Sequence, residues 1–215
     1  MQAVGTVVAF GAAPAADAAR LDAVALACTV LAGDFRLIKQ ADGGSLLFAL
    51  LDDDRDPALA AASKALRILR KRGGGEALVV LPPAQATPGP QARSRLQRAA
   101  ELMDACVVQP VGAAAWADAV RCFVEPLSIF GLAGVDPREI HALIRPRLAI
   151  LRDALDPLSG AREIFVSCRL RPNASLHDLD DAAQTVAERT PEARLILAGP
   201  EVSDDGPRVL VASLF

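Results

Sequence analysis

The 215-residue sequence predicts an α/β protein with a mostly parallel N-terminal sheet and flanking helices, a central helix, and a small α+β C-terminal domain with a mixed sheet. Three observations predict this fold class. Short apolar runs alternate with helical patterns as far as residue 110, which is typical of a parallel sheet covered by helices. A long helical pattern without a strand signal then spans residues 113–130. The last third is expected to form strand, helix, strand and strand, which indicates a small mixed sheet.

The first quarter of the chain begins with an apolar, β-branched run at residues 4–10, which ends at a glycine and predicts a strand. An alanine-rich helical pattern follows over residues 15–31. Residues 35–39 and 45–51 are two further strand candidates, and the Asp-Gly pair between them favours a tight turn. We therefore expect these two strands to form a hairpin.

A second helix is predicted to start at Asp56 and Pro57 and to end near residue 72. Aspartate can cap a helix, proline suits its first position, and glycines after a basic last turn favour its end. The patterns that follow predict a strand, a helix and a strand at residues 77–81, 91–104 and 105–109. Their alternation continues the parallel sheet.

After the central helix, the pattern breaks at residues 131–135 and a new helix is predicted to open at Asp136. Asp136 is a favoured cap, the proline after it suits the first helical position, and Glu139 can reach back to the cap amide. Local structure alone therefore explains both carboxylates. The remaining predicted elements are a strand, a helix and two strands at residues 163–170, 175–189, 194–198 and 208–214.

The composition argues against several classes of function. A net charge of −3 and a pI near 5.4 lack the basic excess that binding a run of phosphates requires, so nucleic acid is not expected as a partner. No apolar run approaches the roughly 18 residues of a membrane span, and the N-terminus has no basic leader, so we expect a cytoplasmic protein without membrane contact. The four cysteines lie far apart and only two histidines occur, so neither a metal site nor a disulfide framework is predicted.

The turn after the first strand stands where a nucleotide-binding α/β fold would bind phosphate. It consists of Gly11, Ala12 and Ala13 followed by a proline. A phosphate loop needs several glycines, because the backbone must turn tightly and approach the phosphates closely. We interpret this segment as a degenerate phosphate loop, and no nucleotide or other cofactor is predicted to bind there.

A run of acidic residues that includes Asp52, Asp53 and Asp54 precedes the second helix. Carboxylates at short spacing can ligate a hard cation such as magnesium or calcium. This run lacks the glycine turn and the distal glutamate of a calcium loop, so we interpret it as a solvated acidic segment before a helix N-terminus. No metal is predicted.

The segment EPLSIFGLAGVDPREIHALI, residues 125–144, resembles the end of the central helix, the synergy loop and the following helix in the FtsZ branch of the FtsZ/tubulin GTPase family. Its interface residues fall where that loop has a glycine, an apolar residue and two acidic residues: Gly131, Leu132, Asp136 and Glu139. The order and spacing of the predicted elements continue the resemblance over residues 77–215. The first 76 residues resemble the family weakly.

The sequence also departs from the family pattern. The acidic run replaces the glycine- and threonine-rich tubulin signature, and its carboxylates would repel a triphosphate. Gly134 stands in place of the synergy-loop asparagine, and Glu139 in place of its second aspartate. By comparison with the family, we expect a helix and loop to be missing between residues 149 and 161, and we expect no tail of the kind by which FtsZ proteins recruit partners after Phe215. The resemblance therefore implies a truncated FtsZ/tubulin-like fold.

The resemblance implies three units: a degenerate nucleotide-binding-like domain at residues 1–110, the central helix and synergy-like loop at 111–135, and an activation-like domain at 136–215. In the family, the synergy loop of one subunit completes the GTPase site of the next. A chain that kept this loop and lost the phosphate loops is expected to work by association rather than by hydrolysis.

The resulting hypothesis is a bacterial, nucleotide-independent FtsZ-like protein, a pseudo-GTPase that associates with itself or with an FtsZ-type polymer as a scaffold or modulator in cell division or the cytoskeleton. GTPase activity is not expected. Two alternatives stay open. One is a small α/β enzyme or metabolite-binding protein that reuses the FtsZ-like cleft, since a fold does not determine function. The other is an active but divergent GTPase.

Overall fold

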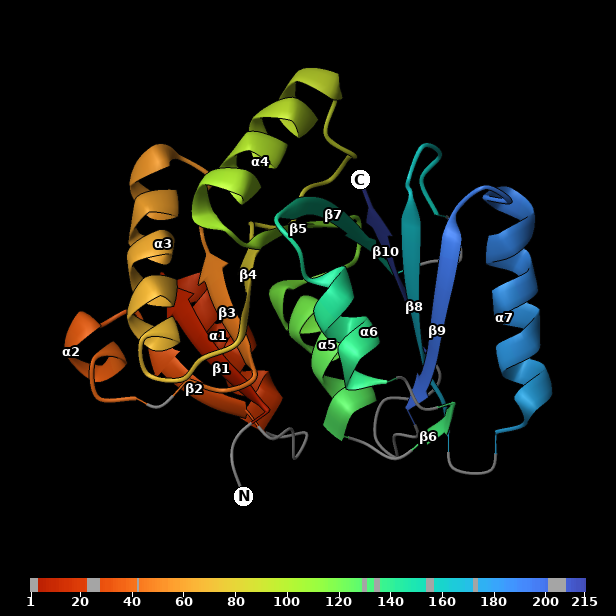
Figure 1. Ribbon diagram of the computed structural model, residues 1–215, viewed down its shortest axis with the longest axis horizontal. Helices are drawn as coiled ribbons and strands as arrows, with labels where there is room; N and C mark the ends of the chain where they lie inside the picture. The colour runs from red at the N-terminus through yellow and green to blue at the C-terminus, as the bar shows by residue number, and fades with distance from the viewer. Residues whose placement is uncertain are drawn as a thin grey trace.

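The computed structural model describes residues 4–22, 28–41, 43–128, 131–133, 136–153, 157–171, 174–200 and 208–215. One sheet runs through it, with the strand order β2-β1-β3-β4-β5-β7-β10-β8-β9-β6 (Figure 1). The strands are β1 Gly5–Phe10, β2 Cys28–Ala32, β3 Leu46–Leu51, β4 Glu76–Val80, β5 Cys106–Val111, β6 Gly131–Ala133, β7 Arg147–Arg152, β8 Glu163–Arg169, β9 Arg194–Pro200 and β10 Arg208–Leu214. The helices are α1 Ala12–Asp22, α2 Phe35–Ile38, α3 Asp56–Arg70, α4 Pro90–Met103, α5 Trp116–Ser128, α6 Pro137–Leu143 and α7 Leu176–Arg189.

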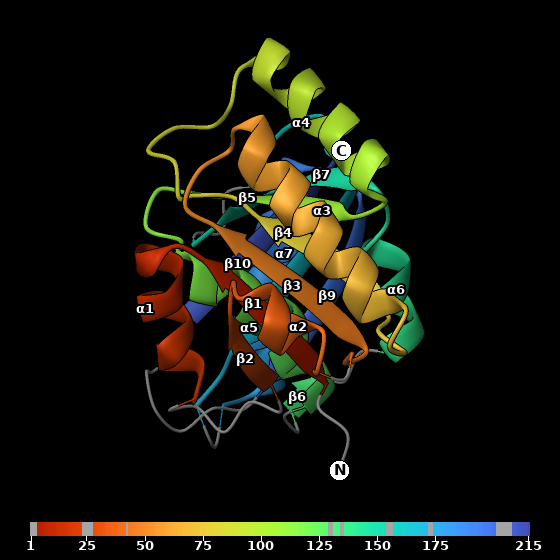
Figure 2. The same cartoon turned by 90° about the vertical axis from the view of Figure 1, so that its left-hand side faces the viewer.

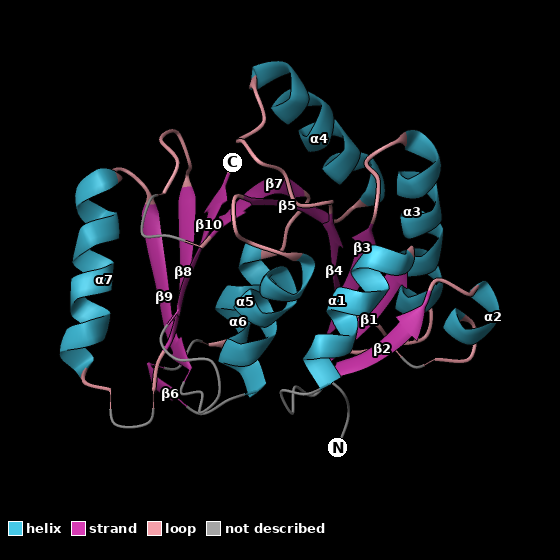
Figure 3. Ribbon diagram, turned by 180° about the vertical axis from the view of Figure 1, so that it is seen from behind, coloured by secondary structure: helices cyan, strands magenta, loops and turns pink. Residues whose placement is uncertain are grey.

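The N-terminal half of the sheet is parallel. Strands β2, β1, β3, β4, β5 and β7 all pair in this way, and every residue of β3 and β5 is buried. Helices α3 and α4 cover one face (Figure 2), whereas α1 and α5 cover the other (Figure 3). Burial on both faces explains the continuous apolar runs of these strands.

The C-terminal half of the sheet is mixed. Strand β10 pairs antiparallel with both β7 and β8, β8 pairs parallel with β9, and β9 pairs antiparallel with β6. Helix α7 packs on one face through Leu179, Ala182 and Val186. On the other face the rings of Phe123 in α5 and Phe165 in β8 stack with centroids 5.6 Å apart. The predicted α/β fold class is confirmed.

A buried ion pair joins the two halves of the sheet. Arg169 at the end of β8 donates from Nε to Oε2 of Glu125 in α5 at 2.9 Å, and both side chains are 0% exposed. Charges buried in this way are costly unless they are paired, so each residue depends on the other. The central helix is therefore anchored to the mixed half by electrostatics as well as by ring packing.

The predicted hairpin near the N-terminus is wrong. Residues expected as its first strand form the short helix α2, and the Asp34 side chain caps it by accepting from the Arg36 amide at 2.8 Å. Strand β3 instead pairs in parallel with β1 and β4. Asp42, on which the turn prediction depended, lies outside the described residues. The pairing of β3 with β1 and β4 determines the structure of this segment, and a local turn signal carries no information on that pairing.

Two further boundaries differ from the predictions. The alanine-rich pattern expected as one helix over residues 15–31 holds α1, which ends at Asp22, and the edge strand β2. The helix predicted to be capped by Asp56 has Arg55 at its N-cap, and Asp56 is its first residue. Strand β7 was not predicted, although burial inside the sheet explains its apolar sequence. The other predicted strands and helices form within a few residues of the expected bounds.

The cysteines behave as buried apolar residues. None of the four forms a disulfide; Cys106, Cys122 and Cys168 are buried, and Cys28 is partly buried. Burial raises the pKa of Cys106 to about 12 and that of Cys168 to about 11, and it also raises the pKa of Cys122. Their thiols are therefore protonated at neutral pH, which makes them poor nucleophiles and poor metal ligands.

Candidate functional site

The carboxyl edge of the parallel strands is the first candidate site. In the sheet, β2 lies on one side of β1 and β3 lies on the other side, so the direction of strand addition reverses at β1. Ligands of open α/β sheets bind in the crevice outside the carboxyl ends of strands at such a switch point. Here Gly11 follows β1 and Asp52 follows β3. The structure therefore brings both predicted phosphate-loop segments to one place.

The Asp52 carboxylate lies directly against the backbone of Gly11. Gly11 has φ +110°, and a Cβ atom added to it would lie 2.0 Å from Oδ2 of Asp52. Glycine is therefore required at this position both by the backbone conformation and by the space that Asp52 occupies. A negative charge stands at the switch point, at the edge of the turn.

The other two carboxylates of the acidic run form ion pairs. Asp53 accepts from the backbone amide and from Nε of Arg55, both at 2.5 Å. These hydrogen bonds hold the pKa of Asp53 below its usual value. Asp54 pairs with Arg95 of α4. Asp53 is therefore paired within the segment, and Asp54 is paired with an arginine of a neighbouring helix.

The start of α5 closes the same edge of the sheet. The Trp116 indole donates from Nε1 to the carbonyl oxygen of Leu51, the last residue of β3, at 2.8 Å. The buried Asp17 of α1 accepts from the amide of Ala117 at 2.7 Å. These two bonds tie α1, β3 and α5 together at this edge of the sheet.

The start of α6 is the second candidate site. Gly131 and Leu132 lie in β6, where Gly131 is opposite Pro200 of β9, and Gly134 lies outside the described residues. Asp136 caps α6, because its Oδ1 accepts from the amide of Arg138 at 2.8 Å. The predicted capping role of Asp136 is therefore confirmed, and its side chain is exposed.

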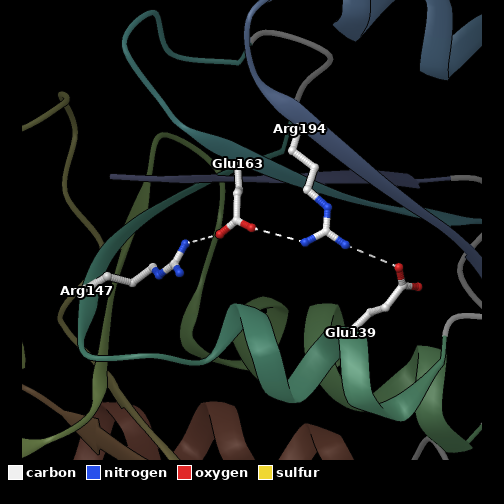
Figure 4. Close-up of polar contacts among 4 residues, drawn as sticks. All are labelled: Glu139, Arg147, Glu163 and Arg194. Atoms are coloured by element: carbon white, nitrogen blue, oxygen red, sulfur yellow. Dashed lines mark hydrogen bonds and ion pairs between the residues drawn. The ribbon is translucent and has the colours of Figure 1, made fainter.

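Glu139 does not close a capping box as expected. Its Oε1 lies 3.4 Å from one terminal nitrogen of Arg194 in β9, and the other terminal nitrogen of Arg194 lies 3.4 Å from Glu163 in β8 (Figure 4). Arg147 of β7 binds the second oxygen of Glu163. This chain of charges draws Glu139 toward the sheet, away from the helix start, although its side chain remains 44% exposed.

Comparison with known proteins gives structural matches only. No protein-family model matches the sequence, and no curated protein matches it significantly. An empty FtsZ dimer from M. jannaschii is similar with a TM-score of 0.69 at 15% identity, over 100% of this chain and 89% of that chain. CetZ from Methanosaeta thermophila is similar with a TM-score of 0.59 at 13% identity, over 97% and 86%. GDP-form protofilaments of TubZ from Bacillus thuringiensis serovar israelensis are similar with a TM-score of 0.58 at 11% identity, over 99% and 85%.

This chain has an FtsZ/tubulin-like fold. At these identities the similarity shows the fold alone. In this fold the residues at the switch point can be compared with what a nucleoside triphosphate requires. A phosphate cradle presents several converging amides and a positive field. Here Ala12 and Ala13 carry methyl groups, Pro14 has no amide proton, and Asp52 presents a negative charge. The residues at this edge do not fit a triphosphate.

The two candidate sites of the FtsZ/tubulin-like fold do not meet within one chain. Helix α5 begins beside the end of β3, where Trp116 binds Leu51, and its 13 residues end at Ser128. At a rise of about 1.5 Å per residue, this helix separates its two ends by about 20 Å. Strand β6 and the start of α6 follow its far end. A site shared by both sets of residues requires a second chain.

Sequence reasoning missed several residues that build these sites. Trp116 is the only tryptophan in the chain, which is a signal that could have drawn attention to it. Asp17 and Arg194 gave no such signal, since their partners are 100 and 55 residues away in sequence. In the part of the chain that the structure describes, no group of three or more His, Cys, Asp or Glu residues could hold a metal ion. No described helix is long and apolar enough to cross a membrane.

Proposed function

We propose that this protein is a nucleotide-independent FtsZ-like protein that acts by association, with itself or with an FtsZ-type polymer, as a cytoskeletal scaffold or modulator. The observation that carries the proposal is the Asp52 carboxylate against Gly11, at the switch point of an FtsZ/tubulin-like fold. The similar structures are an FtsZ dimer and TubZ protofilaments, so two proteins with this fold associate, which supports the proposal.

Electrostatic repulsion between Asp52 and a triphosphate supports a function that does not depend on a nucleotide. Two like unit charges about 4 Å apart repel by about 1 kcal/mol in water and by about 4 kcal/mol at the effective dielectric constant near a protein surface. A triphosphate carries several charges, and the crevice offers Asp52 where a cradle would offer amides. The arginine that follows the acidic run, Arg55, is paired with Asp53, and Arg95 of α4 is paired with Asp54.

The start of α6 supplies the association surface in this proposal. Gly131, Leu132, Asp136 and Glu139 would meet a neighbouring subunit, as the synergy loop does in the resembling family. The exposed cap Asp136 and the half-exposed Glu139 are accessible for such a contact. The proposal keeps the division into residues 1–110, 111–135 and 136–215, with the first unit as a retained scaffold.

Calorimetry and sedimentation of the purified full chain test the proposal. We expect no heat of binding with Mg-GTP at micromolar concentrations, with a GTP-binding FtsZ as the positive control. We expect the chain to associate with itself, or to co-sediment with an FtsZ polymer, equally with and without added GTP. Micromolar GTP binding, or assembly that depends on GTP, would overturn the proposal. A chain that neither associates with itself nor co-sediments would overturn it as well.

A further inference from the structure

Two surfaces of opposite charge each carry an exposed leucine. Leu102 of α4 is 87% exposed and Leu176 of α7 is 67% exposed, which is unusual for large apolar side chains of the described residues. Figure 1 shows α3 and α7 toward opposite ends of the longest axis of the molecule. Exposed apolar groups framed by charge are typical of sites that bind another protein.

The first surface is a groove of about 590 Å³ between α3 and α4, here named the basic groove. Its apolar lining includes Leu59 of α3 and Leu102 of α4. The exposed Arg98 of α4 lines it directly, and the exposed Arg67 and Lys71 line the adjoining hollow, which shares Leu102 with the groove. One exposed carboxylate, Asp56 at the start of α3, also lines the groove, so the cations outnumber it. Arg70, by contrast, is bound to Asp104, and Arg95 to Asp54.

The second surface is the outer side of α7, here named the acidic face. It includes a hollow of about 420 Å³ lined by Leu176, His177, Leu179, Asp180, Ala183 and Leu197 of β9. Nδ1 of His177 lies 3.6 Å from Oδ1 of Asp181. Its exposed carboxylates lie along the helix at Asp180, Asp181 and Glu188. Asp178 is held by the capping box with Ser175, so it belongs to the helix start.

We propose that the acidic face of one copy of this chain docks into the basic groove of the next copy. Charge complementarity points to this occupant, because the chain itself supplies an acidic helix with an exposed leucine. Opposite charges steer association and set the orientation of the partners. Different patches on the two subunits form a heterologous contact, which produces an open chain of subunits where the rotation does not close a ring.

This inference rests on the proposed function, since it names a further pair of surfaces for self-association in addition to the start of α6. It is independent of the start of α6, because none of the residues that line the basic groove or the acidic face belongs to that region. A filament built in this way would extend from the α3 end of one molecule to the α7 end of its neighbour (Figure 1).

Charge reversal with a mixing rescue tests the interface. The groove variant combines Arg67→Glu with Arg98→Glu, and the face variant combines Asp180→Lys with Asp181→Lys. All four side chains are exposed, so circular dichroism and thermal unfolding should match the unchanged protein. Sedimentation velocity over a concentration series at low salt measures association. A matched control reverses Arg36 and Lys39 to Glu on the exposed side of α2, outside both surfaces.

We expect each variant alone to associate at least about tenfold more weakly than the unchanged protein, since like charges then face each other. An equimolar mixture of the two variants should recover association. The acidic groove of the groove variant then meets the basic face of the face variant, and the unchanged face of the groove variant meets the unchanged groove of the face variant. High salt should weaken the unchanged interface, and the α2 control should have no effect.

Unaltered association of both variants, or no recovery on mixing, would overturn the interface and leave the proposed function standing. The interface is also overturned, and the proposed function stands, if the unchanged chain is monomeric by itself but co-sediments with an FtsZ polymer. A groove that captures only another acidic protein, and never a second copy of this chain, also overturns the inference. Failure of both self-association and co-sedimentation would overturn the inference and the proposed function together.

Discussion

The parallel half and the mixed half of the sheet use acidic residues in different ways. In the parallel half, Asp52 stands beyond the end of β3 and faces Gly11, at the position where this class of fold receives ligands. In the mixed half, Glu139 and Glu163 bind arginines that link α6, β7, β8 and β9. A carboxylate thus stands against the turn after β1 in one half, whereas carboxylates connect structural elements in the other. Acidic residues near a candidate site can therefore stand at a ligand position in one region and hold structural elements together in another.

The largest effect is expected where the two halves meet. Replacing Glu125 by Gln removes the charge that pairs with the buried guanidinium of Arg169, which should lower the free energy of unfolding by about 3–5 kcal/mol. Chemical denaturation measures this loss. The double replacement Glu125→Leu with Arg169→Met should recover most of the stability, because apolar residues of similar volume often replace a buried pair without cost. A single variant as stable as the unchanged protein would show that the pair does not join the halves.

A smaller effect is expected at the crevice of the parallel half. Gly11→Ala places a Cβ 2.0 Å from Oδ2 of Asp52 and forces alanine to φ +110°, so it should destabilise the protein by about 1–3 kcal/mol. Adding Asp52→Ala removes the collision and should recover only part of the loss, because the backbone strain remains. Full recovery in denaturation experiments would indicate that the backbone conformation carries no cost.

At the start of α6, in the mixed half, the two candidate residues should differ. Asp136→Ala removes a helix cap and should cost about 1 kcal/mol. Glu139→Gln removes an exposed ion pair with Arg194 and should cost less than about 1 kcal/mol. Thermal unfolding ranks the two variants. If either variant also reduces association by more than its effect on stability explains, the residue acts at an interface; if neither does, both are structural.

The smallest effects concern acid titration of one aspartate in each half. Arg55 lowers the pKa of Asp53, and the Ser175 amide and hydroxyl lower that of Asp178. A carboxylate with a lowered folded pKa contributes stability above its unfolded pKa of about 3.9 and loses it as the pH falls through the folded value. Carbon NMR titration should show that Ser175→Ala raises only the pKa of Asp178 and that Arg55→Ala raises only that of Asp53. A common shift of both would contradict these local causes.

Local signals predicted most elements correctly. The capping role of Asp136, the helix at α7 and the buried strands β4 and β5 all depend on residues close in sequence. The predictions failed where pairing across the sheet decided the outcome. An Asp-Gly pair indicated a hairpin, but β3 gains more by lying in parallel between β1 and β4, where all six of its residues are buried. Strand β7 likewise takes its place only because β5 and β10 flank it.

For this protein, the sequence by itself determined the alternation of strands and helices, the absence of a glycine-rich loop after β1, and the acidic run after β3, because these follow from composition and short-range periodicity. Only the tertiary structure decided that Asp52 lies against Gly11, that Glu139 binds Arg194, and that Glu125 and Arg169 form a buried pair. Their partners are 41 to 55 residues apart, and such contacts form only when the whole sheet has assembled.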